Sequence, residues 1–358
     1  MRIAFIIPSL SSKGPVNQAV SLALALMKNQ KSIKISFYVL DLDTSSPNYE
    51  RLIGNGVSIS HLGGSLWSKA HAILGLVKSG RFDILHSHCL VPDFLSYITK
   101  KIQKNSRTLH ISTCHCFLKT DYAYTYGKKR GLVLSCLHAL LFKGLDKVVS
   151  CSSSVRKYLD QEHQIASYPV RNGSDVSHEN IAKLENHESY KFVYVGPFIH
   201  RKNINKLLLE FSNRSFDNCS LELIGGGPLL SSLKKEYAFD PYITFSGNLS
   251  HIEVLEHISH SDCMVSFSSA EGFPMALLEG LSLGKPLLVS DIEPHRELLS
   301  LGNCGWLVSN EHNHFDMVLK SEEKLEISKS ALTVYNRNLT SSIMAKGYFD
   351  IYSKELDK

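Results

Sequence analysis

The sequence predicts an α/β protein built from two doubly wound domains, each a parallel sheet with helices on both faces. Short β-branched runs alternate with amphipathic stretches twice along the chain, with a polar break between the two series. The length of 358 residues exceeds what one ordinary core organises and suits two domains. With 43% hydrophobic and 20% charged residues, the composition is that of a globular protein.

The first series predicts six strands and the helices between them. The strand-like runs are Ile3–Ile7, Ile33–Leu40, Val57–Ile59, Ile84–His86, Thr108–Thr113 and Lys147–Ser150. The helical patterns are Val16–Met27, Ala70–Lys78, Phe94–Gln103 and Gly131–Phe142. Between Ser167 and Lys191 the pattern breaks into a polar, charged stretch, where we place the interdomain linker.

The second series predicts six further strands and a helical tail. The strands are Phe192–Val195, Leu221–Ile224, Ile243–Phe245, Met264–Phe267, Pro286–Ser290 and Gly305–Val308. The helices between them begin near Lys202, Leu229, His251, Pro274 and Glu293. We expect domains at residues 1–175 and 176–335, with a last helix over 336–358 that returns toward the first domain. Two such domains place a ligand cleft at the carboxyl ends of their strands.

The chain carries the features of a cytoplasmic protein. No run approaches the roughly 20 apolar residues of a membrane span. The N-terminal Met1–Pro8 passes quickly into a Gly-Pro loop, so it reads as a first strand rather than a signal peptide. The eight cysteines are scattered, several of them within apolar strands, which fits reduced thiols better than a disulfide framework.

The charge is unevenly distributed between the two halves. Residues 1–175 contain 22 Lys and Arg against 10 Asp and Glu, a balance of +12, whereas the rest of the chain has a balance of −7. The first half is therefore expected to meet an anionic surface. Two basic apolar stretches, Tyr97–Lys104 and Lys128–Phe142, can lie on an anionic membrane or can be ordinary solvated helix faces. We expect no nucleic acid partner, because stacking aromatics are not interleaved with the cations.

The stretch from Ala270 to Leu281 is the strongest candidate for a binding site. A buried strand, a Ser-Ser loop and a Gly-Phe-Pro turn lead into a helix, so Glu271 lies on the loop and Glu279 within the helix. Pro274 suits the first turn of that helix. Free backbone N–H groups at such a terminus bind phosphate, and a carboxylate beside phosphate needs a compensating partner. Sugar hydroxyls would supply it, which makes a sugar nucleotide the leading ligand.

Cations and glycines after other strands extend this site. Arg201 and Lys202 stand at a helix start, where adjacent cations are unfavourable unless an anion lies among them. They would neutralise a diphosphate, although a solvated basic pair is the alternative. Gly14 and Gly226 each lie between a strand and a helix, where a glycine lets the backbone approach phosphate, or simply forms a turn. Neither loop has the spaced glycines of a nicotinamide site.

Histidines cluster at the ends of two first-half strands, in His86-Ser87-His88 and in Cys114-His115-Cys116. Their spacing matches no tetrahedral zinc signature, so we expect no metal. His115 is placed to donate to a substrate, with a structural histidine as the alternative. Asp41-Leu42-Asp43 has the form of a metal-binding Asp-x-Asp, but a solvated strand end explains it better.

Taken together, these residues carry a resemblance to a known family. The most specific element is the E-x7-E pair of Glu271 and Glu279. The supporting residues are Asn172-Gly173, Val195-Gly196 with Lys202, Gly225-Gly226-Gly227-Pro228, Phe245-x-Gly247, Gly284-Lys285-Pro286, the Gly14 loop, Asp83–His88 and Thr113–His115. The chain resembles retaining glycosyltransferases of the GT-B fold, family 4 (glycosyl transferases group 1), most densely from Phe192 to Val308.

The resemblance implies roles for individual residues. Glu271 would contact donor-sugar hydroxyls and His115 the reaction centre, and we name these two as catalytic. The implied donor-binding residues are Gly14, Arg201, Lys202, Gly226, Phe273, Pro274, Met275, Ala276 and Glu279, the last of them on the ribose. In front-face displacement the departing diphosphate helps to deprotonate the acceptor hydroxyl, without protein nucleophile or metal. The family usually has Arg where this chain has Pro197, and Arg201 would replace it.

The expected function is transfer of a sugar, with retention, from a nucleotide-diphosphate sugar to a glycan or lipid-diphosphate-linked acceptor. The setting would be surface polysaccharide biosynthesis (O-antigen, capsule or exopolysaccharide), with the protein peripheral on the inner face of the plasma membrane. No cofactor or metal is expected. A sugar-nucleotide 2-epimerase of the same fold and a non-catalytic sugar-nucleotide-binding subunit are the alternatives.

Overall fold

The computed structural model describes residues 1–176, 189–308 and 313–357. The chain forms two compact units, residues Met1–Ser174 with Thr340–Lys358, and residues Asp175–Leu339. The sequence predicted domain boundaries after residues 175 and 335, whereas the boundaries between the compact units lie after Ser174 and Leu339. The predicted linker between Ser167 and Lys191 lies partly outside the described residues.

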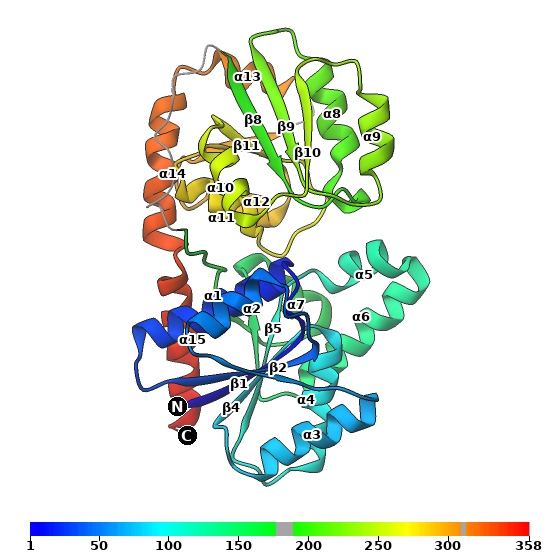
Figure 1. Ribbon diagram of the computed structural model, residues 1–358, viewed down its shortest axis with the longest axis vertical. Helices are drawn as coiled ribbons and strands as arrows, with labels where there is room; N and C mark the ends of the chain where they lie inside the picture. The colour runs from blue at the N-terminus through cyan, green and yellow to red at the C-terminus, as the bar shows by residue number, and fades with distance from the viewer. Residues whose placement is uncertain (177–188, 309–312, 358) are drawn as a thin grey trace. The chain divides into compact units, whose positions relative to one another are not determined.

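The first unit is built on a parallel sheet with the strand order β3-β2-β1-β4-β5-β6-β7 (Figure 1). Its strands are β1 (Arg2–Ser9), β2 (Lys34–Asp41), β3 (Ser58–His61), β4 (Ile84–His88), β5 (Leu109–Cys114), β6 (Lys147–Ser150) and β7 (Tyr168–Pro169). The strand order reverses direction between β1 and β4. In doubly wound sheets such a reversal opens a crevice at the carboxyl ends of the strands.

Helices cover both faces of this sheet. They are α1 (Gly14–Asn29), α2 (Pro47–Gly54), α3 (Leu66–Lys78), α4 (Leu90–Ile102), α5 (Leu118–Tyr126), α6 (Lys128–Lys143), α7 (Ser153–His163) and α15 (Ser341–Leu356). Side chains of β1 alternate between the faces, so Phe5 packs with α1 and α15, whereas Ile6 packs with α3. The C-terminal helix α15 thus belongs to the first unit, and Gln18 of α1 donates to Tyr348 of α15 at 3.2 Å.

The second unit repeats the architecture with the strand order β10-β9-β8-β11-β12-β13. Its strands are β8 (Tyr190–Val195), β9 (Cys219–Ile224), β10 (Ile243–Gly247), β11 (Cys263–Ser266), β12 (Leu287–Ser290) and β13 (Gly305–Val308). Its helices are the 3-10 turn η1 (His200–Lys202), α8 (Ile204–Ser212), α9 (Leu230–Glu236), α10 (His251–Ser259), α11 (Met275–Ser282), α12 (Glu293–Leu299), α13 (His314–Lys320) and α14 (Lys324–Asn338). Here the strand order reverses between β8 and β11.

The predicted fold is confirmed, because both units are parallel sheets with helices on their faces. Every predicted strand overlaps an observed one, and the unpredicted β7 is only two residues long, too short for a period-2 pattern. Pro274 was expected within the first turn of a helix, but it is the N-cap residue of α11. No helix in the described part of the chain is long and apolar enough to span a bilayer.

Candidate active site

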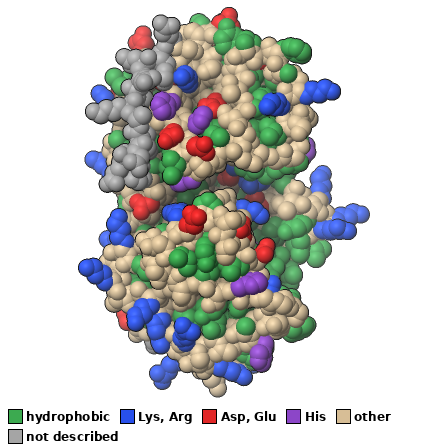
Figure 2. Space-filling view, viewed as in Figure 1, with side chains coloured by type: hydrophobic (Ala, Val, Ile, Leu, Met, Phe, Trp, Pro, Cys, Tyr) green, Lys and Arg blue, Asp and Glu red, His purple; other side chains and the backbone are tan. Residues whose placement is uncertain are grey.

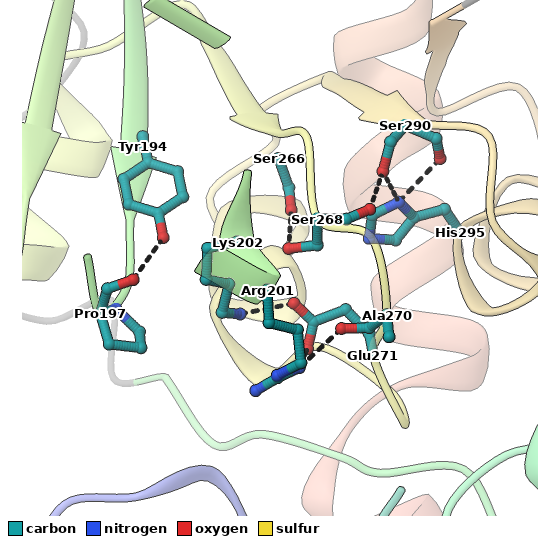
Figure 3. Close-up of polar contacts among 10 residues, drawn as sticks. All are labelled: Tyr194, Pro197, Arg201, Lys202, Ser266, Ser268, Ala270, Glu271, Ser290 and His295. Atoms are coloured by element: carbon teal, nitrogen blue, oxygen red, sulfur yellow. Dashed lines mark hydrogen bonds and ion pairs between the residues drawn. The ribbon is translucent and has the colours of Figure 1, made fainter. Parts of the chain in front are cut away.

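Glu271 lies at the centre of a charged cluster in the second unit (Figure 3). Its carboxylate accepts from Lys202 Nζ at 2.5 Å and from Arg201 Nη1 at 3.2 Å, and Arg201 Nη1 also donates to the carbonyl of Ala270 at 2.6 Å. Glu271 is 6% exposed. The sequence argument left its compensation to sugar hydroxyls. In the structure the two cations assigned to the diphosphate compensate Glu271 directly.

The cluster forms because its residues follow neighbouring strands of one sheet. Arg201 and Lys202 lie in η1, after β8, and Glu271 lies on the loop after β11. The carboxyl ends of adjacent parallel strands share one edge of the sheet. The backbone N–H of Ser269 donates to the carbonyl of Arg201 at 2.8 Å, which ties the two loops together. Asn203, in the left-handed conformation at φ 51°, ends η1 and begins α8.

Electrostatics keep Glu271 ionised. Burial by itself would raise the pKa of this carboxyl, but Lys202 and Arg201 outweigh burial and lower the pKa to about 2. The carboxylate is therefore charged at neutral pH. A permanently ionised carboxylate can accept hydrogen bonds from hydroxyl groups but cannot act as a general acid.

The N-terminus of α11 adds backbone donors beside this cluster. Pro274 is the N-cap, no side chain caps the helix, and its first residues Met275 and Ala276 are partly exposed. Phe273, before the cap, is buried. The first backbone N–H groups of a helix have no partner within it and can bind an anion. Further along α11, Glu279 lies 3.0 Å from Nε2 of the exposed His251.

The glycine run after β9 has a packing role that the sequence left open. A Cβ at Gly225, whose φ is +134°, would lie 2.1 Å from the carbonyl oxygen of Gly196. A Cβ at Gly226 would lie 2.8 Å from the side chain of Asn248. The run therefore packs against the loop after β8, where Tyr194 donates to the carbonyl of Pro197 at 3.1 Å. Close backbone packing therefore accounts for Gly225, whereas a Cβ at Gly226 would meet only the end of the Asn248 side chain, which can move aside.

His295, which the sequence analysis missed, supports the Glu271 loop. It lies in the first turn of α12, after β12, and is fully buried. Its Nδ1 lies 2.9 Å from the carbonyl oxygen of Ser290, so Nδ1 must carry the proton. Ser290 Oγ in turn donates to the carbonyl of Ser268 at 2.6 Å (Figure 3). The signal that could have found it was a histidine five residues after β12, the strand next to β11 in the sheet.

Nε2 of His295 is a buried, unprotonated nitrogen whose lone pair has no hydrogen-bond partner among the described residues. Burial lowers the pKa of His295 to about 4, with the carboxylate of Glu271 acting against this and Lys202 adding to it. The imidazole is therefore neutral at pH 7. The unpaired Nε2 belongs to a ring whose pKa is influenced by the charges of both Glu271 and Lys202.

In the first unit, His115 pairs with a second histidine. It follows β5 directly and is half-buried, and its Nε2 lies 2.9 Å from Nδ1 of the buried His88 in β4. Burial, with a smaller contribution from His138, lowers the pKa of His115 to about 3, so the ring is neutral. His88 Nε2 has no partner among the described residues. Because an unpaired buried N–H costs more than an unpaired lone pair, we assign the shared proton to His88 Nδ1. His115 then carries its own proton on Nδ1.

The other first-unit candidates separate into structural and open positions. His86 lies 2.6 Å from the Tyr352 hydroxyl and 2.9 Å from Thr113 Oγ1, so it is a satisfied core histidine. Asp43 is exposed and accepts from Ser45, as a solvated strand end would. Gly14 begins α1, and a Cβ added there would meet nothing within 4 Å. Neither backbone strain nor packing therefore demands a glycine at this position.

The structure thus brings Glu271, Arg201 and Lys202 together beside the start of α11. Glu279 is held by His251 in the same unit, and Gly14 and His115 belong to the first unit. Within the residues that the structure describes, no group of three or more His, Cys, Asp or Glu side chains could hold a metal ion.

Comparison with known proteins matches each half of the chain to a glycosyltransferase family model. Residues 13–178 match the family model Glycosyltransferase Family 4, and residues 176–338 match the model Glycosyl transferases group 1. The O-antigen biosynthesis glycosyltransferase WclY of Escherichia coli is 23% identical, over 99% of this chain and 98% of its own. The UDP-Gal:alpha-D-GlcNAc-diphosphoundecaprenol alpha-1,3-galactosyltransferase of Escherichia coli is 23% identical over 75% of this chain and 72% of its own. The crystal structure of Anabaena Alr3699/HepE in complex with UDP and glucose superposes with a TM-score of 0.77 at 14% identity, covering 99% of both chains.

Proposed function

Since a glycosyltransferase family model matches each half of it, this chain is a glycosyltransferase of the GT-B fold, and we propose that it uses a nucleotide-diphosphate sugar as donor. The acceptor would be a hydroxyl of a glycan carried on a lipid diphosphate, and the anomeric configuration would be retained. The observation that carries the proposal is the cluster of Glu271, Lys202 and Arg201 beside the start of α11.

The cluster offers complementary groups for the two ends of such a donor. The amides at the start of α11 and the cations of η1 suit a diphosphate. The Glu271 carboxylate, charged because its pKa is about 2, suits the hydroxyls of the transferred sugar. On donor binding Lys202 would be shared between Glu271 and the diphosphate. His115, neutral and with its proton on Nδ1, would donate to a sugar or phosphate oxygen.

The proposed reaction needs no nucleophile from the protein. The acceptor oxygen forms a bond to the anomeric carbon while the bond from that carbon to the diphosphate oxygen breaks. The acceptor proton passes to the departing diphosphate, whose negative charge Lys202, Arg201 and the α11 amides stabilise. Attack on the face from which the diphosphate leaves gives retention. No metal is required for this charge balance.

The acceptor class rests on the relatives. WclY is named for O-antigen biosynthesis, and the galactosyltransferase is named for a diphosphoundecaprenol-linked acceptor. A lipid-linked acceptor would place the protein at the inner face of the plasma membrane, in surface polysaccharide biosynthesis.

Two measurements test the proposal. Thermal-shift screening against UDP, GDP, ADP and their sugars should identify a donor, because a ligand that binds only the folded state raises its stability. Nuclear magnetic resonance of the product should then show the same anomeric configuration as the donor. Complete conversion of the donor without acceptor would identify an epimerase instead. Donor binding without transfer to any lipid-linked glycan would indicate a binding subunit.

A further inference from the structure

Helix α6 in the first unit exposes a row of apolar side chains. The exposed fractions are 53% for Leu132, 67% for Val133, 41% for Leu137 and 62% for Leu140, and Cys136 between them is also exposed. Positions i, i+1, i+4, i+5 and i+8 lie along one side of a helix. We call these five residues the α6 outer face. Monomeric proteins rarely expose a contiguous apolar stripe without a function for it.

The opposite side of α6 is fixed to the first unit. His138 lies 2.7 Å from the buried Asp93 of α4 and 2.6 Å from the Tyr122 hydroxyl of α5. Asp93 also accepts from Ser87 of β4 at 2.5 Å. A Cβ at Gly131 would lie 2.5 Å from the backbone of Tyr122, so α5 and α6 cross in close contact. The buried hydrogen bonds of His138 and Asp93 thus fix the orientation of α6, with the outer face directed away from the first unit.

Cations stand at both ends of the outer face. Lys128, Lys129 and Arg130 form the first turn of α6 and Lys143 the last, and all four are exposed. The helix contains no acidic residue. Three cations at a helix N-terminus oppose the helix dipole, and none forms an ion pair with another residue that the structure describes. Figure 2 shows basic and apolar side chains together over α5 and α6, at the right of the view.

We propose that the α6 outer face docks the protein on an anionic lipid bilayer, with its apolar row in the headgroup region and its cations on lipid phosphates. The inference rests on the proposed lipid-linked acceptor, which would be presented at such a surface. An apolar face flanked by lysines and arginines is what interfacial helices use. Tyr124 and Tyr126 of the adjacent α5 are also exposed, as aromatic side chains at a bilayer interface are.

Two features favour lipid over other assignments. A second copy docked on this face would bring like-charged helix ends together without an acidic residue of α6 to pair them. In the other basic stretch of the first half, two lysines already have partners: Lys100 pairs with Asp146 at 2.7 Å, and Lys101 lies over the Tyr97 ring. The structure therefore separates two stretches that the sequence treated alike.

Flotation with vesicles tests the proposal on the full chain. The wild type should float with vesicles of phosphatidylcholine and phosphatidylglycerol, less in high salt, and not with phosphatidylcholine alone. The triple variant K128Q/K129Q/R130Q should bind anionic vesicles about 100-fold more weakly, at about fivefold per cation removed. The double variant V133E/L140E should bind them at least about tenfold more weakly, because it puts two carboxylates into the apolar row. The matched control L209E/L325E changes leucines that are 59% and 68% exposed in the second unit, and it should float as the wild type does.

Three outcomes would overturn the proposal. They are equal or negligible binding of the wild type to both vesicle types, wild-type flotation of both outer-face variants, and conversion of a dimer to monomer by V133E/L140E in light scattering, which would assign the face to a second copy. Thermal-shift titration with nucleotide sugars, without vesicles, tests the proposed function separately. A protein that binds a donor but no vesicle loses only the docking proposal.

Discussion

The Glu271 carboxylate and the Lys202 ammonium lie 2.5 Å apart, although 68 residues separate them in the chain. They meet because β8 and β11 are neighbours in the second sheet and each residue follows its strand. A carboxylate at a proposed anion site is thereby neutralised before any ligand arrives. In the proposed donor complex, the same contact would position Lys202 for the diphosphate, so that Glu271 would serve both ends of the sugar nucleotide.

Replacing Glu271 by glutamine should lower transfer by at least about 100-fold, because the neutral amide binds hydroxyls less strongly and leaves Lys202 and Arg201 uncompensated. The same change should lower the free energy of unfolding by about 1–3 kcal/mol, since the cluster is largely buried. Transfer rates and urea denaturation measure the two effects.

Glu236→Gln is the matched control for this change, because Glu236 is an exposed carboxylate at the end of α9. It should change neither quantity. Wild-type turnover of Glu271→Gln would remove Glu271 from the site.

The contribution of Glu271 to stability should depend on pH in acid only. Its pKa is about 2 in the folded protein against the ordinary 4.5, because Lys202 and Arg201 outweigh burial. A lowered carboxyl pKa stabilises the fold fully above the unfolded pKa and progressively less as the pH falls toward the folded pKa. The difference in unfolding free energy between wild type and Glu271→Gln should therefore be constant from about pH 5.5 to 8 and shrink below about pH 4.5. A difference as large at pH 3.5 as at pH 7 would contradict this assignment.

The sequence predicted both sheets because strand and helix periods are local properties of the chain. It also identified Glu271, Arg201 and Lys202, because each follows a predicted strand. It could not show that the two cations pair with Glu271, since this depends on which strands are neighbours. His295 escaped notice for the same reason. The exposure of Val133 and Leu140 could not be predicted from the helical pattern of their segment. The spacing of apolar residues predicts a helix but does not show which face of that helix packs against the sheet.

Two glycines that look alike in sequence should behave differently when changed to alanine. Gly225→Ala should cost at least about 2 kcal/mol of stability, because the new Cβ would lie 2.1 Å from the Gly196 carbonyl oxygen and φ is +134°. Gly14→Ala meets nothing within 4 Å, so its stability should stay within about 0.5 kcal/mol of the wild type.

Gly14→Ala should nevertheless weaken donor binding, since the methyl group would occupy the space proposed for a phosphate. Urea denaturation and calorimetric titration with the nucleotide sugar separate the two effects. Unchanged donor affinity in Gly14→Ala would assign the Gly14 loop to the turn alone.

His115 should act at a constant protonation state across the working pH range. Burial and His138 lower its pKa to about 3, and the buried His88 holds its Nε2, so the ring stays neutral with its proton on Nδ1. We therefore expect kcat/KM to show no inflection near pH 6.5 from this residue.

His115→Asn should lower kcat/KM by about 10- to 100-fold, by the same factor at pH 5.5 and at pH 8. His88→Asn, which can keep a donor toward His115, should retain more activity than His88→Ala. An acid limb near pH 6.5 that is present in the wild type and absent from His115→Asn would show that His115 titrates, and the neutral pairing with His88 would then be wrong.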